Sequence, residues 1–180
     1  MIFNSAQPHC WAHPRELNDA MPELTDTFTN LKNLYAGIWA LTNHAGPDRA
    51  ALMATFAAPH WNGVYIIYQK AQVEPLYIGS AGKLERNAHG VLIRTGQAVR
   101  KRLFDGNSPY FFDKDNPVWR YGPTTPDVPP AGYRFQIPIS TIHIDSFHVP
   151  NTHAATVLEH VLLQGCVNEF GNIPVANQKF

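Results

Sequence analysis

The chain has 180 residues, of which 44% are hydrophobic, and this is enough for one domain with a buried core. The formal net charge is zero, which excludes the overall basic balance of many nucleic-acid-binding proteins, so any anion-binding surface must be local. The two cysteines, Cys10 and Cys166, lie far apart in the sequence, and neither a disulfide framework nor a thiolate zinc site is expected.

No segment of the sequence predicts a contact with a membrane. No stretch approaches the roughly 18 consecutive apolar residues that a membrane-spanning helix requires. The first residues, Met1-Ile2-Phe3-Asn4, lack the basic start and the apolar run of a signal peptide. We therefore expect a cytoplasmic protein that makes no contact with a membrane.

Two helices are predicted in the first third of the chain. Apolar residues recur at steps of three and four over residues 22–41, which is the period of one helix face. A shorter helix is predicted over residues 47–57, and Pro59 ends it because the proline ring cannot continue the helical hydrogen bonds. We interpret residues 1–61 as an N-terminal helical extension that packs on the rest of the chain or mediates dimerisation.

The character of the sequence changes at residue 62. Residues 63–68 are β-branched and aromatic and are flanked by turn-forming residues, which predicts a buried strand. A second strand is predicted over residues 76–79, antiparallel to the first. Residues 80–95 are mostly polar and contain several glycines, and this composition predicts a loop.

Helices and strands are predicted in separate segments of the second half of the chain. A short helix is predicted over residues 96–104, and residues 105–131, with six prolines, are expected to be irregular. Residues 133–137 alternate between apolar and polar and predict a half-exposed strand, and a long helix is predicted over residues 151–170. We therefore expect an α+β fold over residues 62–180, with a small antiparallel three-stranded sheet flanked by helices.

Two short motifs lie on the first two predicted strands. Gly63-Val64-Tyr65 is followed by Tyr77-Ile78-Gly79, which begins twelve residues after Tyr65. A helix with arginines, a third strand, a helix that contains Glu159, and finally Asn177 come after them in this order. Over residues 62–178 this arrangement resembles the GIY-YIG nucleases, and the resemblance implies hydrolysis of phosphodiester bonds in DNA.

The resemblance also implies a role for each residue of the motifs. Glu159 would be the ligand of a divalent cation, Mg²⁺ or Mn²⁺, which acts as a Lewis acid and takes few protein ligands. Tyr65 would contact or deprotonate the attacking water, which requires nearby cations or the metal to lower its pKa from ~10. Tyr77 would hydrogen-bond the phosphate or its water, and Arg102 would bind the scissile phosphate. Asn177 would orient a backbone segment or a phosphate.

Two assignments depend on the helix predicted over residues 96–104: which arginine binds the phosphate, and which group transfers a proton. Arg102 fits the family pattern better than Arg100, and the two point roughly 200° apart on a helix, so only one should face the site. Many family members have His or Tyr four residues after this arginine, but here that position is Gly106. His89 and Tyr110 are the candidates to replace the missing group.

A local excess of positive charge supports double-stranded DNA as the partner. Residues 80–104 contain six basic residues and one acidic residue, and the phosphate backbone supplies most non-specific affinity for such a patch. The basic residues are Lys83, Arg86, Arg94, Arg100, Lys101 and Arg102.

The most specific interpretation is a type II restriction endonuclease, which as a homodimer would cut both strands. The insertion after residue 79 resembles the stand-alone restriction enzymes of the family. A toxin-type nuclease and a non-catalytic DNA-binding protein on the same fold remain alternatives. The nine histidines include no His-Glu-x-x-His motif, and no Gly-x-Ser-x-Gly motif is present, so neither a zinc site nor a serine hydrolase is expected.

Overall fold

A computed structural model describes most of the chain after residue 24. The described residues are 25–56, 62–82, 84–86, 88–89, 92–94, 98–104, 112, 118–121, 135–149 and 152–177. The beginning of the first predicted helix, Pro59, Lys83, Gly106 and Tyr110 lie outside this part. Among the described residues, no helix is both long and apolar enough to cross a membrane.

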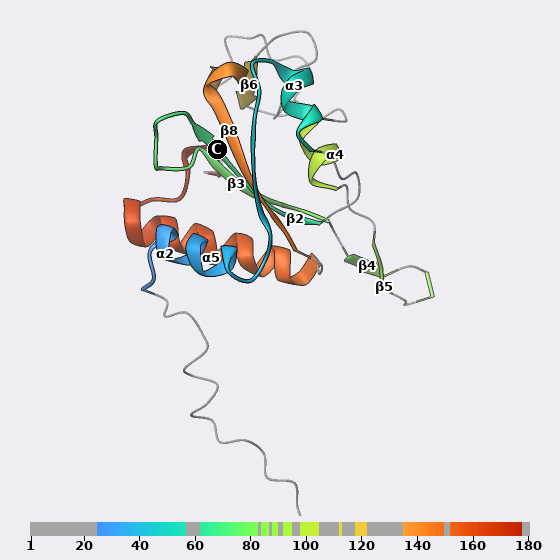
Figure 1. The fold of residues 1–180 in the computed structure, drawn as a ribbon. Helices are drawn as coiled ribbons and strands as arrows, with labels where there is room; N and C mark the ends of the chain where they lie inside the picture. Colours follow the sequence, from blue (N-terminus) through green and yellow to red (C-terminus); the bar gives the residue numbers. More distant parts are fainter. Residues whose placement is uncertain are drawn as a thin grey trace, which may run out of the picture.

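The centre of the fold is an antiparallel sheet of four strands. Its order is β1 (Leu41–Ala45), β8 (Ile142–His148), β2 (Gly63–Gln69) and β3 (Tyr77–Ala81), and each strand is antiparallel to its neighbours. Helices cover this sheet, as Figure 1 shows, and the fold is therefore α+β as predicted. The expected number of three strands is wrong for this sheet, because β1 adds a fourth.

The identity of the third predicted strand also needs correction. The predicted segment 133–137 overlaps β7 (Phe135–Pro138), which pairs with β6 (Val118–Tyr121) in a separate two-stranded ribbon. The strand that completes the centre of the main sheet is β8, where no strand was predicted. The alternation of apolar and polar residues in β8 extends over only four residues and breaks at Ser146, so the pattern that identifies a half-buried strand is too short to predict it. Asp145 and Ser146 are nevertheless buried.

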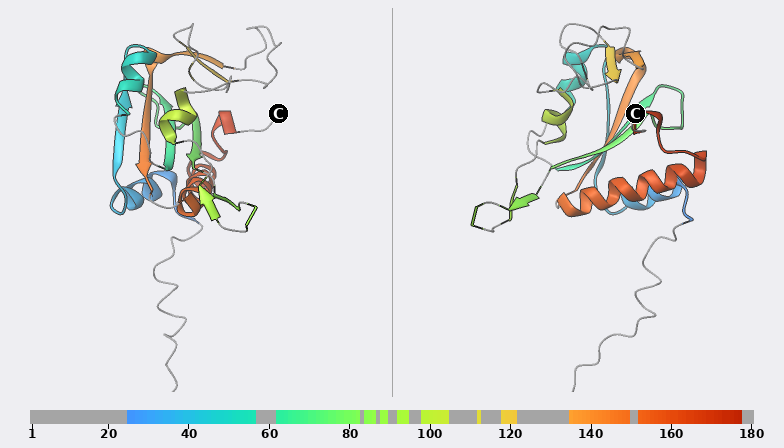
Figure 2. Two further views of the ribbon diagram at one scale, coloured as in Figure 1. Left: turned by 90° about the vertical axis from the view of Figure 1, so that its right-hand side faces the viewer. Right: turned by 180° about the vertical axis from the view of Figure 1, so that it is seen from behind.

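Helices lie on both faces of the sheet. α2 (Phe28–Ala36) and α5 (Thr152–Phe170) lie side by side on one face, and α3 (Arg49–Ala54) and α4 (Val99–Phe104) lie on the other (Figures 1 and 2). α2 begins after Thr27, whose side chain accepts a hydrogen bond from the backbone N–H of Asn30 at 3.3 Å. The predictions of α3, α4 and α5 are confirmed over these narrower bounds.

The N-terminal third contributes the strand β1 to the sheet, so it is not a purely helical extension. α2 ends at Ala36, whereas the predicted helix continued to residue 41. Gly37 follows as the C-cap, and Ile38, which fits the apolar period of the helix, is 60% exposed. Leu41 instead begins β1 and lies opposite Phe147 of β8. The apolar period of the helix therefore continues by chance into β1. The local pattern cannot distinguish this strand from the end of a longer helix.

The segment after β3 contains a hairpin where a loop was predicted. β4 (Leu84–Arg86) and β5 (Leu92–Arg94) are antiparallel and three residues long. The chain then enters α4. Two short 3₁₀ turns complete the described elements, η2 (Ile139–Thr141) before β8 and η3 (Val175–Asn177) after α5.

The pleat of β2 divides the core into two layers. Val64, Ile66 and Tyr68 point toward α2 and α5, while Tyr65 and Ile67 point toward α3 and α4. All five side chains are buried. The two sides of the sheet therefore present different residues, and this division decides which predicted site residues can meet.

Candidate active site

Tyr65 and Tyr77 lie together on the α4 side of the sheet. Tyr65 of β2 lies opposite Gly79 of β3, and Tyr77 lies two residues earlier on the same face of β3. The two rings are stacked with centroids 5.9 Å apart and an interplanar angle of 29°. A methyl group at residue 79 would lie 2.8 Å from the Tyr65 hydroxyl oxygen and 2.6 Å from Cε1 of Tyr77. Gly79 therefore lets the Tyr65 phenol lie across the edge strand.

Arg102 of α4 lies near the buried phenol of this pair. The positive charge of its guanidinium acts on the Tyr65 hydroxyl. Arg102 is exposed, Tyr77 is half-buried and Tyr65 is completely buried, so the cluster extends from the core to the surface. Arg102, rather than Arg100, is thus the arginine beside the tyrosines.

The residues around Tyr65 do not by themselves lower its pKa. Burial raises the pKa of Tyr65 well above its usual value, and the neighbouring Tyr77 raises it further. The positive charge of Arg102 lowers the pKa but does not outweigh burial. Tyr65 is therefore a neutral phenol near pH 7, suited to hold its neighbours in place rather than to accept a proton.

The short helix α4 is held by a residue of the N-terminal third. Arg49 of α3 donates hydrogen bonds to the carbonyl oxygens of Phe104, at 2.5 Å, and of Phe112, at 3.3 Å. Its guanidinium carbon also lies 5.7 Å from the centroid of the Phe104 ring. A cation at the C-terminal end of a helix is favourable, because the last carbonyl groups have no partner within the helix. Arg49 therefore helps to fix the helix that presents Arg102.

Glu159 approaches the edge strand from the other face of the sheet. It lies on α5, is half-buried, and accepts a hydrogen bond from the hydroxyl of Ser80 on β3. Ser80 lies between Gly79 and Ala81 and so points to the face opposite Tyr77 and Gly79. The predicted residues therefore form two groups, which approach β3 from its two sides.

Asn177 binds the outer edge of β3. Its side-chain oxygen accepts a hydrogen bond from the backbone N–H of Ile78 at 2.8 Å, and its Nδ2 donates to the carbonyl oxygen of Ile78 at 2.7 Å. The N–H of Ala176 donates to the carbonyl oxygen of Leu76 at 3.0 Å. β3 is the last strand in the order of the sheet, so these bonds pair backbone groups that β2 does not reach.

The donor atoms at Glu159 fit a hard divalent cation better than zinc. A carboxylate and a hydroxyl are oxygen donors, and Mg²⁺ often takes one or two carboxylates and keeps several waters. Within the described part of the chain, no group of three or more His, Cys, Asp or Glu side chains is arranged to hold a metal ion.

The basic residues of the predicted patch lie on two elements. Arg100 is half-buried and Lys101 is exposed on α4, while Arg86 and Arg94 end the two strands of the β4–β5 hairpin. The hairpin and α4 lie on the same side of the molecule in the views of Figures 1 and 2. His89, a candidate proton-transfer group, is exposed in the connection between β4 and β5.

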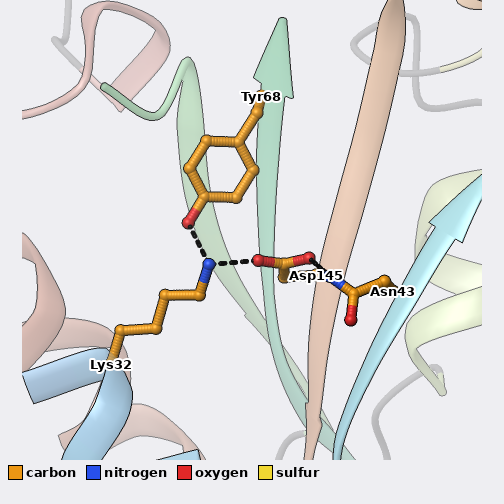
Figure 3. Close-up of polar contacts among 4 residues, drawn as sticks. All are labelled: Lys32, Asn43, Tyr68 and Asp145. Atoms are coloured by element: carbon orange, nitrogen blue, oxygen red, sulfur yellow. Dashed lines mark hydrogen bonds and ion pairs between the residues drawn. The ribbon is translucent and has the colours of Figure 1, made fainter. Parts of the chain in front are cut away.

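A buried charged cluster, which the sequence did not indicate, lies on the α2 and α5 side (Figure 3). Asp145 of β8 is 1% exposed, forms an ion pair with Lys32 of α2, and accepts a hydrogen bond from Asn43 at 2.5 Å. Lys32 also donates to the Tyr68 hydroxyl at 3.1 Å, and the His143 ring stacks on Tyr68 at 4.6 Å. This cluster connects α2 to three strands and lies on the opposite face from Tyr65.

A second buried polar group lies on the same face as Tyr65. His44 of β1 bonds Ser146 through Nε2 at 2.8 Å and Thr55 through Nδ1 at 3.0 Å, and its ring stacks on Phe56 at 3.7 Å. The Thr55 hydroxyl donates to the carbonyl oxygen of Leu52, so it accepts from His44 and the Nδ1 atom carries the proton. Burial lowers the pKa of His44 to about 4. The group is buried from solvent and has a structural role.

Comparison of the chain with family models, with curated proteins and with solved structures finds no match. Function is therefore inferred from the residues of the site and their geometry, because a fold alone does not determine an activity.

Proposed function

We propose that this protein is a GIY-YIG-type endonuclease that hydrolyses phosphodiester bonds of double-stranded DNA with Mg²⁺ or Mn²⁺, in the cytoplasm. The observation that carries the proposal is a cluster in which the rings of Tyr65 and Tyr77 stack and the charge of Arg102 acts on the Tyr65 hydroxyl. These residues come from two strands and a helix that are separate in the sequence, and each belongs to the family pattern. Glu159, also part of that pattern, contacts the same edge strand through Ser80.

The exposure of each residue suggests a different role for it in the proposed site. Arg102 is exposed, and its planar guanidinium suits two oxygens of a phosphate. Tyr77 is half-buried and can donate a hydrogen bond to the same phosphate or its water. Tyr65 is buried, and through its hydroxyl it would hold Arg102 in the binding geometry. A cation bound at Glu159 would supply Lewis-acid activation of the phosphate and of a bound water.

The position of these groups around β3 supports a substrate that crosses the edge of the sheet. The tyrosines and Arg102 face one side of β3, and Ser80 and Glu159 face the other. Asn177 and Ala176 bind this edge at Ile78 and Leu76, so a DNA strand would meet both groups by passing β3 near Ser80, whereas a substrate confined to one face would meet only one group. The basic residues on α4 and the β4–β5 hairpin extend this surface and suit the flanking phosphates.

Within this proposal, a type II restriction endonuclease that acts as a homodimer is the preferred assignment, and a toxin-type nuclease is the alternative. The hairpin in the insertion after Gly79 favours the first, because a two-stranded ribbon can enter the major groove of DNA. A non-catalytic DNA-binding protein on the same fold is the second candidate. The glycine at position 106 and the raised pKa of Tyr65 favour it, since both remove an evident proton acceptor.

Cleavage of supercoiled plasmid with Mg²⁺ tests the proposal. We expect the wild type to nick or linearise the plasmid and Glu159→Gln to abolish this activity. Glu169→Gln is the matched control, because Glu169 is on the same helix but binds Thr29 of α2. Discrete fragments would indicate a restriction enzyme and a smear a toxin-type nuclease. DNA binding without cleavage over several DNA sources and metal ions would instead support the non-catalytic protein.

A further inference from the structure

Ser80 is the residue through which the edge strand contacts Glu159. It lies opposite Val64 of β2, and it shares the α5 side of β3 with Ile78. Its hydroxyl donates a hydrogen bond to Oε2 of Glu159, a residue 79 positions later in the sequence. No part of the motif pattern assigns a role to Ser80, which simply follows Gly79 in the chain.

The hydrogen bond from Ser80 reduces a disadvantage of a metal site with one carboxylate, namely the mobility of that side chain. A glutamate on a helix has several rotatable bonds, and fixing such a side chain costs up to about 2 kcal/mol. Ser80 occupies one position on Oε2 and leaves Oε1 and a further lone pair on Oε2 for other ligands. Because the bond orients the carboxylate before any cation arrives, less of this cost falls on cation binding.

Asn177 fixes the strand that presents Ser80. Its amide binds both the N–H and the carbonyl oxygen of Ile78, two residues before Ser80 on the same strand. The edge of β3 is thus held from outside at Ile78, while β2 holds it from inside. A continuous set of contacts therefore connects Asn177, through β3 and Ser80, to the carboxylate of Glu159.

We infer that Ser80 is a positioning residue that holds the Glu159 carboxylate for a divalent cation, and that Asn177 holds the strand segment carrying Ser80. This inference rests on the proposed function, because it assigns the cation to Glu159. It adds a residue to the site, and it gives Asn177 a role through β3 rather than through direct contact with the substrate. Partners that orient a metal ligand typically change metal affinity by about 10- to 100-fold when they are removed.

The test compares two variants of Ser80 that have nearly the same shape. Ser80→Thr keeps a hydroxyl that can donate to Glu159, whereas Ser80→Val lacks it, and both β-branched side chains suit a strand. The affinity of the full chain for Mn²⁺ is measured by electron paramagnetic resonance of the free ion. We expect Ser80→Val to weaken binding about tenfold, Ser80→Thr to stay close to the wild type, and Glu159→Gln to abolish binding. Ser140→Ala, at an exposed serine of η2, is the control and should bind as the wild type does.

Two outcomes separate this inference from the proposed function. If Ser80→Val binds Mn²⁺ as tightly as Ser80→Thr while Glu159→Gln abolishes both binding and plasmid cleavage, Ser80 has no positioning role and the proposed function stands. If the wild type neither binds Mn²⁺ nor cleaves DNA, the proposed function fails and the inference fails with it. Thermal unfolding of each variant confirms that binding is compared between folded proteins.

Discussion

Replacing Gly79 by alanine should damage the site from within the sheet. The added methyl group would lie 2.8 Å from the Tyr65 hydroxyl oxygen, 2.9 Å from Cζ of Tyr65 and 2.6 Å from Cε1 of Tyr77. These distances are well below normal carbon contacts, and the buried Tyr65 ring has no space to retreat. Overpacking of this kind costs about 1–3 kcal/mol. For a chain of this length, that corresponds to a fall in Tm of roughly 2–12 °C.

The variant should also lose more activity than its stability explains, because the methyl group moves the Tyr65 hydroxyl away from Arg102. Gly165→Ala is the matched control. A methyl group there would lie 2.7 Å from Cδ1 of Leu31 and 2.9 Å from Cα of Phe28, so it separates α2 from α5 on the opposite face. We expect both variants to unfold earlier in urea but only Gly79→Ala to cleave plasmid slowly per folded molecule. A Gly79→Ala protein with wild-type stability and rate would refute the packing of Tyr65 over Gly79.

Three further predictions concern the polar groups of the fold. His44→Gln should reduce the pH dependence of the free energy of unfolding. Burial lowers the pKa of His44 from 6.5 to about 4, so the unfolded state binds the proton first as the pH falls, and the free energy of unfolding of the wild type should fall by up to about 3 kcal/mol between pH 6.5 and 4. An equal fall in both proteins, measured by urea unfolding, would contradict this. Lys32→Met leaves the buried Asp145 carboxylate without its cation and should cost about 3 kcal/mol, part of which Asp145→Asn in the same chain restores; no recovery in the double variant would count against a buried ion pair. Asn177→Ala removes both hydrogen bonds to Ile78 and should cost about 1–2 kcal/mol, with faster hydrogen exchange of the Ile78 amide, and unchanged protection there would argue that the edge does not depend on Asn177.

The elements that local pattern predicts well are those whose signal lies within one segment. β2 is a continuous run of β-branched and aromatic residues, and α5 has a long apolar period, so both were predicted close to their observed bounds. The spacing of the two motifs likewise identified Tyr65 and Tyr77, which the structure brings into contact.

The strand β8 could not be predicted because its stability depends on distant residues. Asp145 would be costly at a buried position by itself, and it is tolerated because Lys32 and Asn43 bind its two oxygens. These partners precede it by more than 100 positions. Ser146 similarly depends on His44 of β1. Local patterns contain no information on such pairs, and polar residues in a short segment therefore resembled a loop.

The surroundings of Tyr65 could not be predicted for a related reason. The number of nearby arginines and lysines is visible in the sequence, and Tyr65 can act as a base only if they or the metal lower its pKa. The degree of burial is not visible there, and burial outweighs the effect of Arg102. For the same reason, the sequence could not show that Glu159 and Tyr65 face opposite sides of β3, since this depends on how α4 and α5 pack on the sheet.

The most direct test of the central claim is the rate of plasmid cleavage by Arg102→Ala and Arg100→Ala with protein in excess over DNA. Both residues lie on α4, two positions apart, and it is the charge of Arg102 that acts on Tyr65. Loss of one preorganised donor to a reacting phosphate typically slows the reaction by about 10²–10³-fold. We predict a loss of this size for Arg102→Ala, with less than a tenfold change for Arg100→Ala and similar DNA affinity for both. An equal loss in the two variants, or full activity in Arg102→Ala, would contradict a site built on Tyr65, Tyr77 and Arg102.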